Sequence, residues 1–467
     1  MIKRKKRFFL LLLITHIFFL SALFFFGVGV YDDSYQYMQM HIHREPGYPF
    51  FLWLLRCISS EHYLWMAGFV QSVLSAFCVS RFTECLSESF GLGGISRMII
   101  LAFALMPYIL TPFFSVNRVM LSSGILSEAL CLPLFLLFTA TLFRAVIERD
   151  KKALITGIFL SLVLSLIRGQ MMASFFIWLI VAGVRVLTDG TAHRHTGSEH
   201  RPGRWKRLLF LLLMLFLCFG LRSFVIRVYN YNVHRRFIGN TYGAVNTLTN
   251  MLYASDREQG EDIEDEELRE IFYFLFDKMT EKGYHYTYGG EERARHLEQV
   301  HDPLKFEVCE AGLQEYLVTQ GITEYLDQNV EADRYAGALM KDLLPGCFLR
   351  WFGNYLLLGM RGAVRNVAVV HPLLNLYAYG MGFLAAAGMI WFFIRHPDRG
   401  EGWLLLIALL SVAGISFSTA LTIMCLSRYM VYGFAPFYTA VYIGILGVGS
   451  CLRDNRRQRE RLDHTEN

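Results

Sequence analysis

The sequence lacks the features of a disulfide framework or a zinc ribbon. It contains nine cysteines, an odd number, and no two of them stand in a C-x-x-C pair. Most lie inside apolar segments, among them Cys78, Cys131, Cys218 and Cys425. Disulfides or a cysteine-ligated zinc ion are therefore excluded as the basis of the fold.

Signature motifs of several soluble enzyme classes are also missing. The chain contains no GxxxxGK[ST], HExxH or GxSxG motif, and no GxGxxG motif after a predicted strand. Nucleotide hydrolysis, zinc proteolysis and serine hydrolysis thus have no local support. Internal repeats are absent too, and the acidic run DREQGEDIEDEELRE is interpreted as a solvated face.

Charged residues are scarce, whereas hydrophobic residues are abundant. Of 467 residues, 18% are charged, 54% are hydrophobic and 15% are aromatic, a composition typical of a polytopic membrane protein. The net charge is +5, but most of the positive excess lies in short loops and tails beside apolar segments, where it orients the chain. We therefore expect membrane lipids as partners, and no nucleic acid.

About ten apolar segments are predicted to span a membrane. The first follows MIKRKKR and, at about 23 residues, is too long for the apolar part of a cleaved signal peptide, so we expect it to be retained. The predicted segments are residues 8–30, 62–80, 95–114, 120–146, 153–167, 170–187, 207–227, 371–394, 402–424 and 429–452.

The basic clusters predict the topology. If the first cluster is cytoplasmic, ten spans place every later cluster on the same side. This parity requires residues 153–187 to form two helices and residues 344–360 to form an interfacial helix. We therefore expect a multi-pass plasma-membrane protein with both termini in the cytoplasm. The clusters are Lys3 to Arg7, Arg144 to Lys152, Arg194 to Arg207, Arg395 with Arg399, and Arg453 to Arg461.

Three parts of the chain follow from this topology. Residues 1–227 form an N-terminal transmembrane module whose first outer loop contains interfacial helices. Residues 228–343 form a small extracytoplasmic insert. Residues 344–467 comprise the interfacial helix, the C-terminal transmembrane helices and a basic cytoplasmic tail. The predicted fold class is therefore an all-α polytopic membrane protein.

Two charged residues interrupt apolar sequence. If a helix begins near Met120, Glu128 lies roughly 12 Å below its end, a depth at which a charge must face protein or a watery cavity. Two roles stay open for Glu128: partner of an arginine such as Arg118 or Arg168, or a direct functional role. Arg168, in LSLIRGQMM, offers a fixed cation at the membrane surface, and its planar guanidinium suits phosphate.

The segment YDDSYQYMQMHIHREPGYPFFL, residues 31–52, places two carboxylates directly after the first span. On a helix, Asp33 and Tyr37 would share one face, and Asp32 would point about 100 degrees away. At most one of the two acids is therefore expected to address a given substrate group. The alternative is an N-cap, for which one Asp would suffice.

Two histidines follow on the same loop. His41 and His43 could bind a metal together with an Asp, but an H-x-H pair without a further fixed ligand favours hydrogen-bonding histidines instead. No cofactor is required by the other residues named, and a divalent metal stays an alternative.

The motifs of this loop resemble a known family. D-S-x-x-Y (Asp33, Ser34, Tyr37), followed by R-x-P-G-Y-P from Arg44 to Pro49, resembles the first extracytoplasmic loop of bacterial GT-C membrane glycosyltransferases. That group is related to protein O-mannosyltransferases and to the aminoarabinose transferase of lipid A. The pair Ser127–Glu128, then Arg168, and the late R-Y-x-x-x-x-x-x-P also resemble it, in the same order. The resemblance covers about residues 1–190 and 371–450, and does not include the insert.

The resemblance implies a GT-C-like helix bundle and an enzyme that transfers a sugar from a polyprenyl phosphate or diphosphate to an acceptor hydroxyl outside the cytoplasm, with inversion. The acceptor would be a glycan, a lipid or a protein. By position, Asp33 would be the general base. Family members often have Glu after this Asp, but here Ser34 follows, so a second acid would have to be Asp32 or Glu128.

The other site residues implied fall into two groups. The departing phosphate needs cations, and the expected donor-phosphate ligands are Arg168, Arg428, Arg44 and Arg118. The expected substrate-positioning residues are Tyr37, Tyr48, Tyr429 and His43.

Two other classes of function stay open. A transporter or flippase for a lipid-linked glycan would use the same charged residues as a pathway, but transporters tend to show inverted repeats and acids near the midplane. Here the charges gather at one predicted face, which favours the enzyme. A non-catalytic membrane partner would use the insert to bind an extracytoplasmic protein.

Overall fold

The computed structural model describes residues 2–114, 118–188 and 203–465, which are almost entirely helical. Their sole strand-like pairing is an isolated bridge between Gly29 and Gly124. The α-helices are α1 (Ile2–Phe26), α2 (Asp32–Met38), α3 (Gly47–Ile58), α4 (Tyr63–Ser89), α5 (Gly94–Phe114), α6 (Glu128–Ile147), α7 (Lys151–Ile167), α8 (Ala173–Thr188), α9 (Arg204–His234), α10 (Gly243–Ala254), α11 (Glu266–Glu281), α12 (Arg293–Pro303), α13 (Ala311–Thr319), α14 (Tyr325–Val367), α15 (Pro372–Arg395), α16 (Gly400–Ala420) and α17 (Ser427–Thr465).

Nine helices of the described residues are long and apolar enough to cross a membrane, which confirms a multi-pass membrane protein. The predicted tenth span corresponds to α7, whose 17 residues reach the lower limit of a spanning helix. Residues 153–187 form two helices, as the charge pattern requires, because the chain breaks between α7 and α8.

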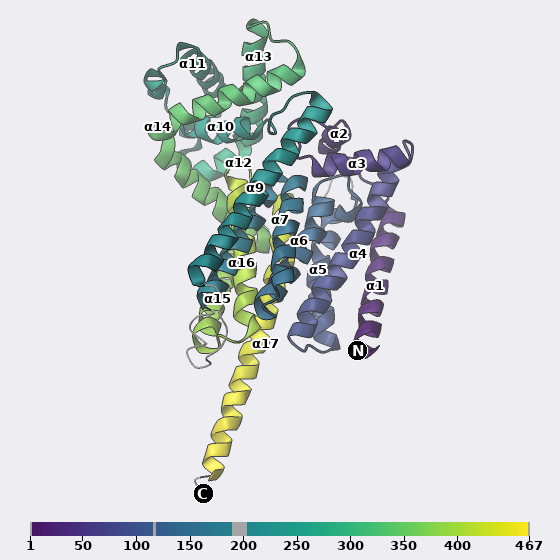
Figure 1. Ribbon diagram of the computed structural model, residues 1–467. Coiled ribbons are helices and arrows are strands. Elements are labelled where there is room, and N and C mark those ends of the chain that lie inside the picture. The colour runs from purple at the N-terminus through teal and green to yellow at the C-terminus, as the bar shows by residue number, and fades with distance from the viewer. Residues whose placement is uncertain (1, 115–117, 189–202, 466–467) are drawn as a thin grey trace.

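The helices form two layers (Figure 1). The long apolar helices run side by side in one bundle, and α10 to α13 gather with the first half of α14 beyond one end of it. Helix α1 begins, and α17 ends, at the opposite end of the bundle.

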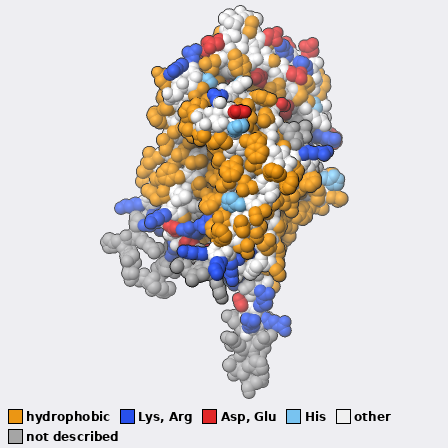
Figure 2. Space-filling model, turned by 90° about the vertical axis from the view of Figure 1, so that its right-hand side faces the viewer, with side chains coloured by type: hydrophobic (Ala, Val, Ile, Leu, Met, Phe, Trp, Pro, Cys, Tyr) orange, Lys and Arg blue, Asp and Glu red, His pale blue; other side chains and the backbone are white. Residues whose placement is uncertain are grey.

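Figure 2 shows a broad hydrophobic band around the middle of one face, with Lys and Arg side chains below it. These basic side chains lie toward the end of the bundle at which Figure 1 places both ends of the chain, as the charge pattern predicted. Residues 194–202 of its third cluster lie outside the described residues.

Helix α3 lies across the end of the bundle and packs against α4 (Figure 1). It exposes Phe50, Trp53 and Leu54 along one side and buries Leu52 and Leu55, the pattern of an interfacial helix. Its first residue, Gly47, lies against the end of α7: a Cβ there would come within 2.8 Å of the Leu166 carbonyl oxygen. Glycine thus permits the close approach that fixes the first outer loop on the bundle.

Two predicted boundaries differ from the structure. The boundary at residue 228 lies inside α9, which continues to His234, and the boundary at residue 344 lies inside α14. Residues 344–360 do not form a separate interfacial helix. They are the middle of the 43-residue α14, which packs against α16 and α17. The amphipathic pattern of this segment reflects contacts with both the insert and the bundle. Arg350, for example, pairs with Asp256 of the insert at 3.1 Å.

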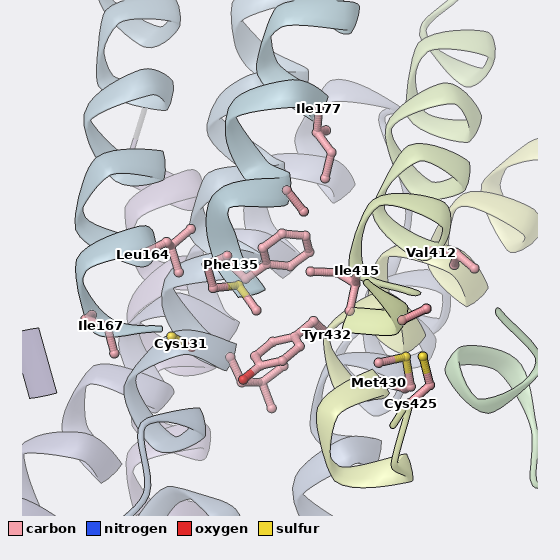
Figure 3. Close-up of a cluster of buried hydrophobic side chains, with 14 of the residues drawn as sticks. Cys131, Phe135, Leu164, Ile167, Ile177, Val412, Ile415, Cys425, Met430 and Tyr432 are labelled. Carbon is pink, nitrogen blue, oxygen red and sulfur yellow. The ribbon is translucent and has the colours of Figure 1, made fainter. Parts of the chain in front are cut away.

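One part of the bundle core lies where α6, α7, α8, α16 and α17 meet (Figure 3). Aromatic, aliphatic and sulfur-containing side chains fill it without charge, and Phe135, Leu164, Ile415 and Tyr432 are among those that are fully buried. This packed region holds in place the ends of α7 and α17, from which the site described below is built.

Candidate functional site

A cavity of about 1000 Å³ opens where the first outer loop, α8, α9, α16 and the insert meet. Its wall has a polar part and an apolar part. Five cations line it, Arg44, Arg168, Arg222, Arg227 and Lys305, together with two acids, Asp33 and Glu45. The apolar part lies between α8 and α16 and includes Phe176, Ile177, Ile180, Leu410 and Phe417. The cavity therefore joins a cationic chamber to a hydrocarbon-like channel.

Helix α2 brings Asp33 and Tyr37 to the cavity, as their four-residue spacing predicted. The N-cap of α2 is Tyr31, and its backbone N–H donates to the Ser34 hydroxyl at 2.8 Å. That hydroxyl in turn donates to the Ile125 carbonyl at 2.7 Å, which ties α2 to the segment before α6. Because Ser34 provides the local hydrogen bonds, the Asp33 carboxylate is not needed as a cap.

The Asp33 carboxylate is held between two arginines from distant parts of the chain. Arg44 donates to one oxygen at 2.6 Å, and Arg428 donates to the other at 2.8 Å. Burial raises the pKa of Asp33, but the two guanidinium groups together outweigh burial and lower it below its usual value. Asp33 is therefore an ionised acceptor at neutral pH.

Asp32 and Arg118 lie elsewhere. Asp32 is exposed and does not line the cavity, although it neighbours Asp33 in sequence. Arg118 is exposed, has a positive φ of 51° and also does not line it. Neither residue is brought together with the other predicted site residues.

Glu128 is the buried partner of Arg168. Its side chain is 2% exposed and does not line the cavity, and its carboxylate pairs with Arg168 at 2.9 Å. The Ser127 hydroxyl donates to Glu128 at 3.2 Å and accepts from Arg168 at 2.8 Å. It also lies 3.0 Å from the Tyr37 hydroxyl. Of the two roles left open, the geometry matches the arginine partner: Glu128 fixes the guanidinium that faces the cavity.

The break between α7 and α8 presents Arg168 to the cavity. Arg168 has an extended backbone (φ −153°, ψ 126°) and precedes a short 3₁₀ turn, η2 (Gly169–Met172). Its guanidinium carbon lies 4.6 Å from the centre of the Tyr429 ring, and its Nε donates to Gln170 at 2.9 Å. The Gln170 amide donates to the Tyr429 carbonyl at 2.8 Å. The turn and the start of α17 are thereby locked together.

Arg428 and Tyr429 lie in the first turn of α17, and Arg428 does not line the cavity. Arg428 donates to the Tyr429 hydroxyl at 2.7 Å, and Tyr429 lines the cavity. Tyr48, by contrast, is fully buried and donates to Gln71 at 2.8 Å, so it packs behind Tyr37 and does not line the cavity.

His43 lines the cavity, and its ring forms a hydrogen bond with the Gln36 side chain at 3.1 Å. The His41 ring forms a hydrogen bond with the Gln39 side chain at 2.8 Å. Burial, and then Arg44, lower the pKa of His43 to about 3, so its ring is neutral. Within the parts of the chain that the structure describes, no group of three or more His, Cys, Asp or Glu side chains is arranged to hold a metal ion.

Sequence reasoning missed four charged residues of the cavity: Glu45, Arg222, Arg227 and Lys305. Arg222 and Arg227 interrupt the apolar α9, and an ionisable residue inside an apolar helix was the signal that could have identified them. Lys305 comes from the insert, where nothing in the sequence distinguishes it from other exposed-looking lysines.

Glu45 stands between Arg44 and Pro46, at the position that the motif R-x-P-G-Y-P leaves unspecified. It pairs with Arg222 at 2.5 Å. Burial raises the pKa of its carboxyl to about 7, even though Arg222 stabilises the charged form. The cavity thus contains a second carboxyl group, which is neither Asp32 nor Glu128.

The arrangement can bind an anion at its cationic end, can hold an apolar chain between α8 and α16, and can accept a proton or hydrogen bond at Asp33. Comparisons with known proteins do not extend this description: no protein-family model, no curated protein and no solved structure matches the chain.

Proposed function

We propose that the protein is a membrane glycosyltransferase that moves a sugar from a polyprenyl-phosphate or polyprenyl-diphosphate donor to an acceptor hydroxyl on the extracytoplasmic face. The observation that carries this proposal is the two-part cavity. A polyprenyl chain needs an apolar path that stays within the membrane, and its phosphate needs cations at the membrane edge. The channel between α8 and α16 and the cationic chamber meet both needs in one continuous space.

Asp33 acts as the general base in this proposal. The acceptor oxygen forms a bond to the anomeric carbon while the bond from that carbon to the phosphate oxygen breaks. The electron pair of the broken bond leaves on the phosphate, and the acceptor proton passes to the Asp33 carboxylate. A single displacement inverts the configuration at the anomeric carbon.

The arginines around Asp33 have two functions in the same step. Arg168, fixed by Glu128, faces the phosphate and stabilises the negative charge that develops on it. Arg44 and Arg428 hold the resting carboxylate and keep its charge. An incoming phosphate competes for their guanidinium groups, which frees the oxygens of Asp33 for the acceptor hydroxyl.

The test is a transfer assay with two adjacent acids. Purified wild type, Asp33→Asn and Asp32→Asn each receive radiolabelled polyprenyl-linked sugars and a membrane extract as acceptor source. We expect Asp33→Asn to lower transfer by a factor of about 10² to 10⁴, the usual contribution of a general base. Asp32→Asn, a change of the same chemistry outside the cavity, should stay within about twofold of wild type.

Two controls make the result decisive. Thermal unfolding shows whether Asp33→Asn still folds, because that change also removes the ion pairs to Arg44 and Arg428. Transfer by folded Asp33→Asn at the wild-type rate would refute the role of Asp33. Binding of the lipid-linked sugar without transfer by wild type, across a range of donors, would favour transport instead.

A further inference from the structure

Two of the cations in the cavity are not neutralised. Arg44 pairs with Asp33, Arg168 with Glu128 and Arg222 with Glu45. Arg227 and Lys305, in contrast, form no ion pair with any carboxylate among the described residues. Both line the same cavity and both are half-buried. An unpaired cation in such a place is costly unless an anion joins it.

Lys305 reaches the cavity from the insert through an unusual backbone. It lies in η5 (Leu304–Glu310), a π-helical segment that follows α12 and packs against α10 and α12. Its ammonium nitrogen lies 4.8 Å from the centre of the Tyr242 ring and 4.2 Å from that of Phe306. Burial lowers the pKa of Lys305, while nearby Asp302 and Glu310 oppose this. Glu310 already accepts a hydrogen bond from Tyr242.

Arg227 lies in the last part of α9, whereas Lys305 belongs to the insert. Its guanidinium is held by Ser223, one turn earlier, through the hydroxyl and through the carbonyl at 3.5 Å. Ser223 also lines the cavity. The cation is therefore positioned by a neutral group, and its charge is available to a ligand.

We propose that the carrier is a diphosphate rather than a monophosphate, and that Arg227 and Lys305 bind its second phosphate. The inference rests on the proposed function. Arg168 and Arg44, which also line the cavity, supply the guanidinium groups for one phosphate diester. A diphosphate-linked sugar carries one more negative charge, and the two unpaired cations supply the additional charge that it needs.

The transfer step remains balanced with this carrier. The bond between the anomeric carbon and the nearer phosphate breaks, its electron pair leaves with the lipid diphosphate, and the acceptor proton goes to Asp33. The added negative charge can spread over both phosphates, so Lys305 and Arg227 stabilise the leaving group as well as the bound donor.

Equilibrium binding tests the inference independently of transfer. Detergent-purified full-length protein binds tritiated farnesyl diphosphate, and unlabelled farnesyl monophosphate and inorganic diphosphate serve as competitors. We expect wild type to prefer farnesyl diphosphate to the monophosphate by about tenfold, the effect of one or two charge-assisted hydrogen bonds. Lys305→Gln and Arg227→Gln should each remove most of this preference, and Lys305→Arg should restore it.

Lys282→Gln is the matched control. Lys282 is also a lysine of the insert, but it is exposed and pairs with Glu307 at 2.9 Å. This variant should keep the preference, and thermal unfolding should show that all variants fold. Equal affinity of wild type for both farnesyl carriers, or a preference that survives both substitutions, would overturn the inference. If inorganic diphosphate displaced the tritiated farnesyl diphosphate as effectively as unlabelled farnesyl diphosphate does, the lipid chain would contribute nothing to binding, and the claim that the ligand is lipid-linked would be overturned.

The two proposals fail in different ways. Suppose that transfer from a monophosphate donor depends on Asp33 and that binding shows no preference for diphosphate. The glycosyltransferase proposal would then stand, and the inference that the carrier is a diphosphate would be refuted. If folded wild type bound neither farnesyl diphosphate nor farnesyl monophosphate, both proposals would be refuted.

Discussion

At the scale of single residues, the cavity is organised by pairs of opposite charge with different roles. Asp33 is ionised and shared by two arginines, whereas Glu128 is sealed behind Arg168. Glu45 differs from both, because burial brings its pKa to about 7, within the physiological range. The three carboxyl groups thus differ in charge and accessibility because their burial and their partners differ: in the proposed reaction Asp33 is the base, Glu128 anchors Arg168, and Glu45 titrates near neutral pH.

The titration of Glu45 predicts a pH dependence of carrier binding. Below about pH 7 its carboxyl is neutral, so Arg222 loses a charged partner and is free to attract phosphate. We expect the affinity for farnesyl diphosphate to rise as the pH falls from 8 to 6. Glu45→Gln, which is neutral at every pH, should bind at pH 8 as tightly as wild type does near pH 6.

The raised pKa of Glu45 also predicts how the stability of the folded protein changes with pH. The folded-state pKa lies above the usual value of 4.5, so ionisation is disfavoured in the folded state, and stability falls as the pH rises from about 5 to 7. Glu45→Gln should remove this loss in thermal unfolding experiments. His43, with a pKa of about 3, and Asp33, with a lowered pKa, do not titrate in this range. An unchanged pH profile in Glu45→Gln would contradict the assignment.

At the scale of elements, short irregular segments position the site and long helices support them. Arg168 faces the cavity because α7 ends there in an extended residue, and Asp33 faces it because α2 is a separate short helix. The first outer loop is fixed where α3 begins against α7. The helices on both sides hold these segments in place.

The close contact between Gly47 and the Leu166 carbonyl predicts that adding a methyl group at residue 47 destabilises the protein. In Gly47→Ala the new Cβ would meet the Leu166 carbonyl, which cannot move without disturbing α7. We expect a loss of about 1–3 kcal/mol in unfolding free energy and lower transfer activity, measured by thermal unfolding in detergent and by the transfer assay. The control is Gly380→Ala in α15, where a Cβ would meet nothing within 4 Å. Equal stability of the two variants would show that the close approach is unimportant.

At the scale of the whole molecule, the insert is part of the site. It provides Tyr242 and Lys305 to the cavity, and the continuous α14 connects it to α16 and α17. A second link is formed by Glu298 of α12, which binds Arg365 of α14 at 3.0 Å. The insert therefore closes over the cationic end of the cavity, and we expect it on the extracytoplasmic side with the termini in the cytoplasm.

Cysteine labelling tests this orientation. Exposed Cys57 is first replaced by Ser. In that background, Glu258→Cys lies on the exposed surface of the insert and Lys151→Cys lies exposed at the start of α7. An impermeant thiol reagent should label Glu258→Cys in intact cells and Lys151→Cys only after permeabilisation. The reverse pattern would invert the topology.

Much of the architecture was determined by the sequence alone. The apolar segments predicted the spans because a membrane requires about 20 apolar residues per helix. The alternation of the basic clusters predicted that residues 153–187 form two helices, and the four-residue spacing predicted that Asp33 and Tyr37 share one face. These properties follow from composition, charge order and helix geometry, none of which requires the tertiary structure.

Other features depended on the tertiary structure. Lys305, Arg222 and Glu45 are far apart in sequence, and they line one cavity because α9 and the insert close over the first outer loop. The partner of Glu128 and the exclusion of Asp32 from the cavity wall were decided in the same way. The amphipathic pattern of residues 344–360 predicted a helix, but only the tertiary structure shows that this helix is continuous with α14 and packs against α16 and α17. The sequence alone determined the spans and the first loop, while packing between distant segments decided which charges face the cavity, because burial and ion pairing depend on neighbours that only the folded chain provides.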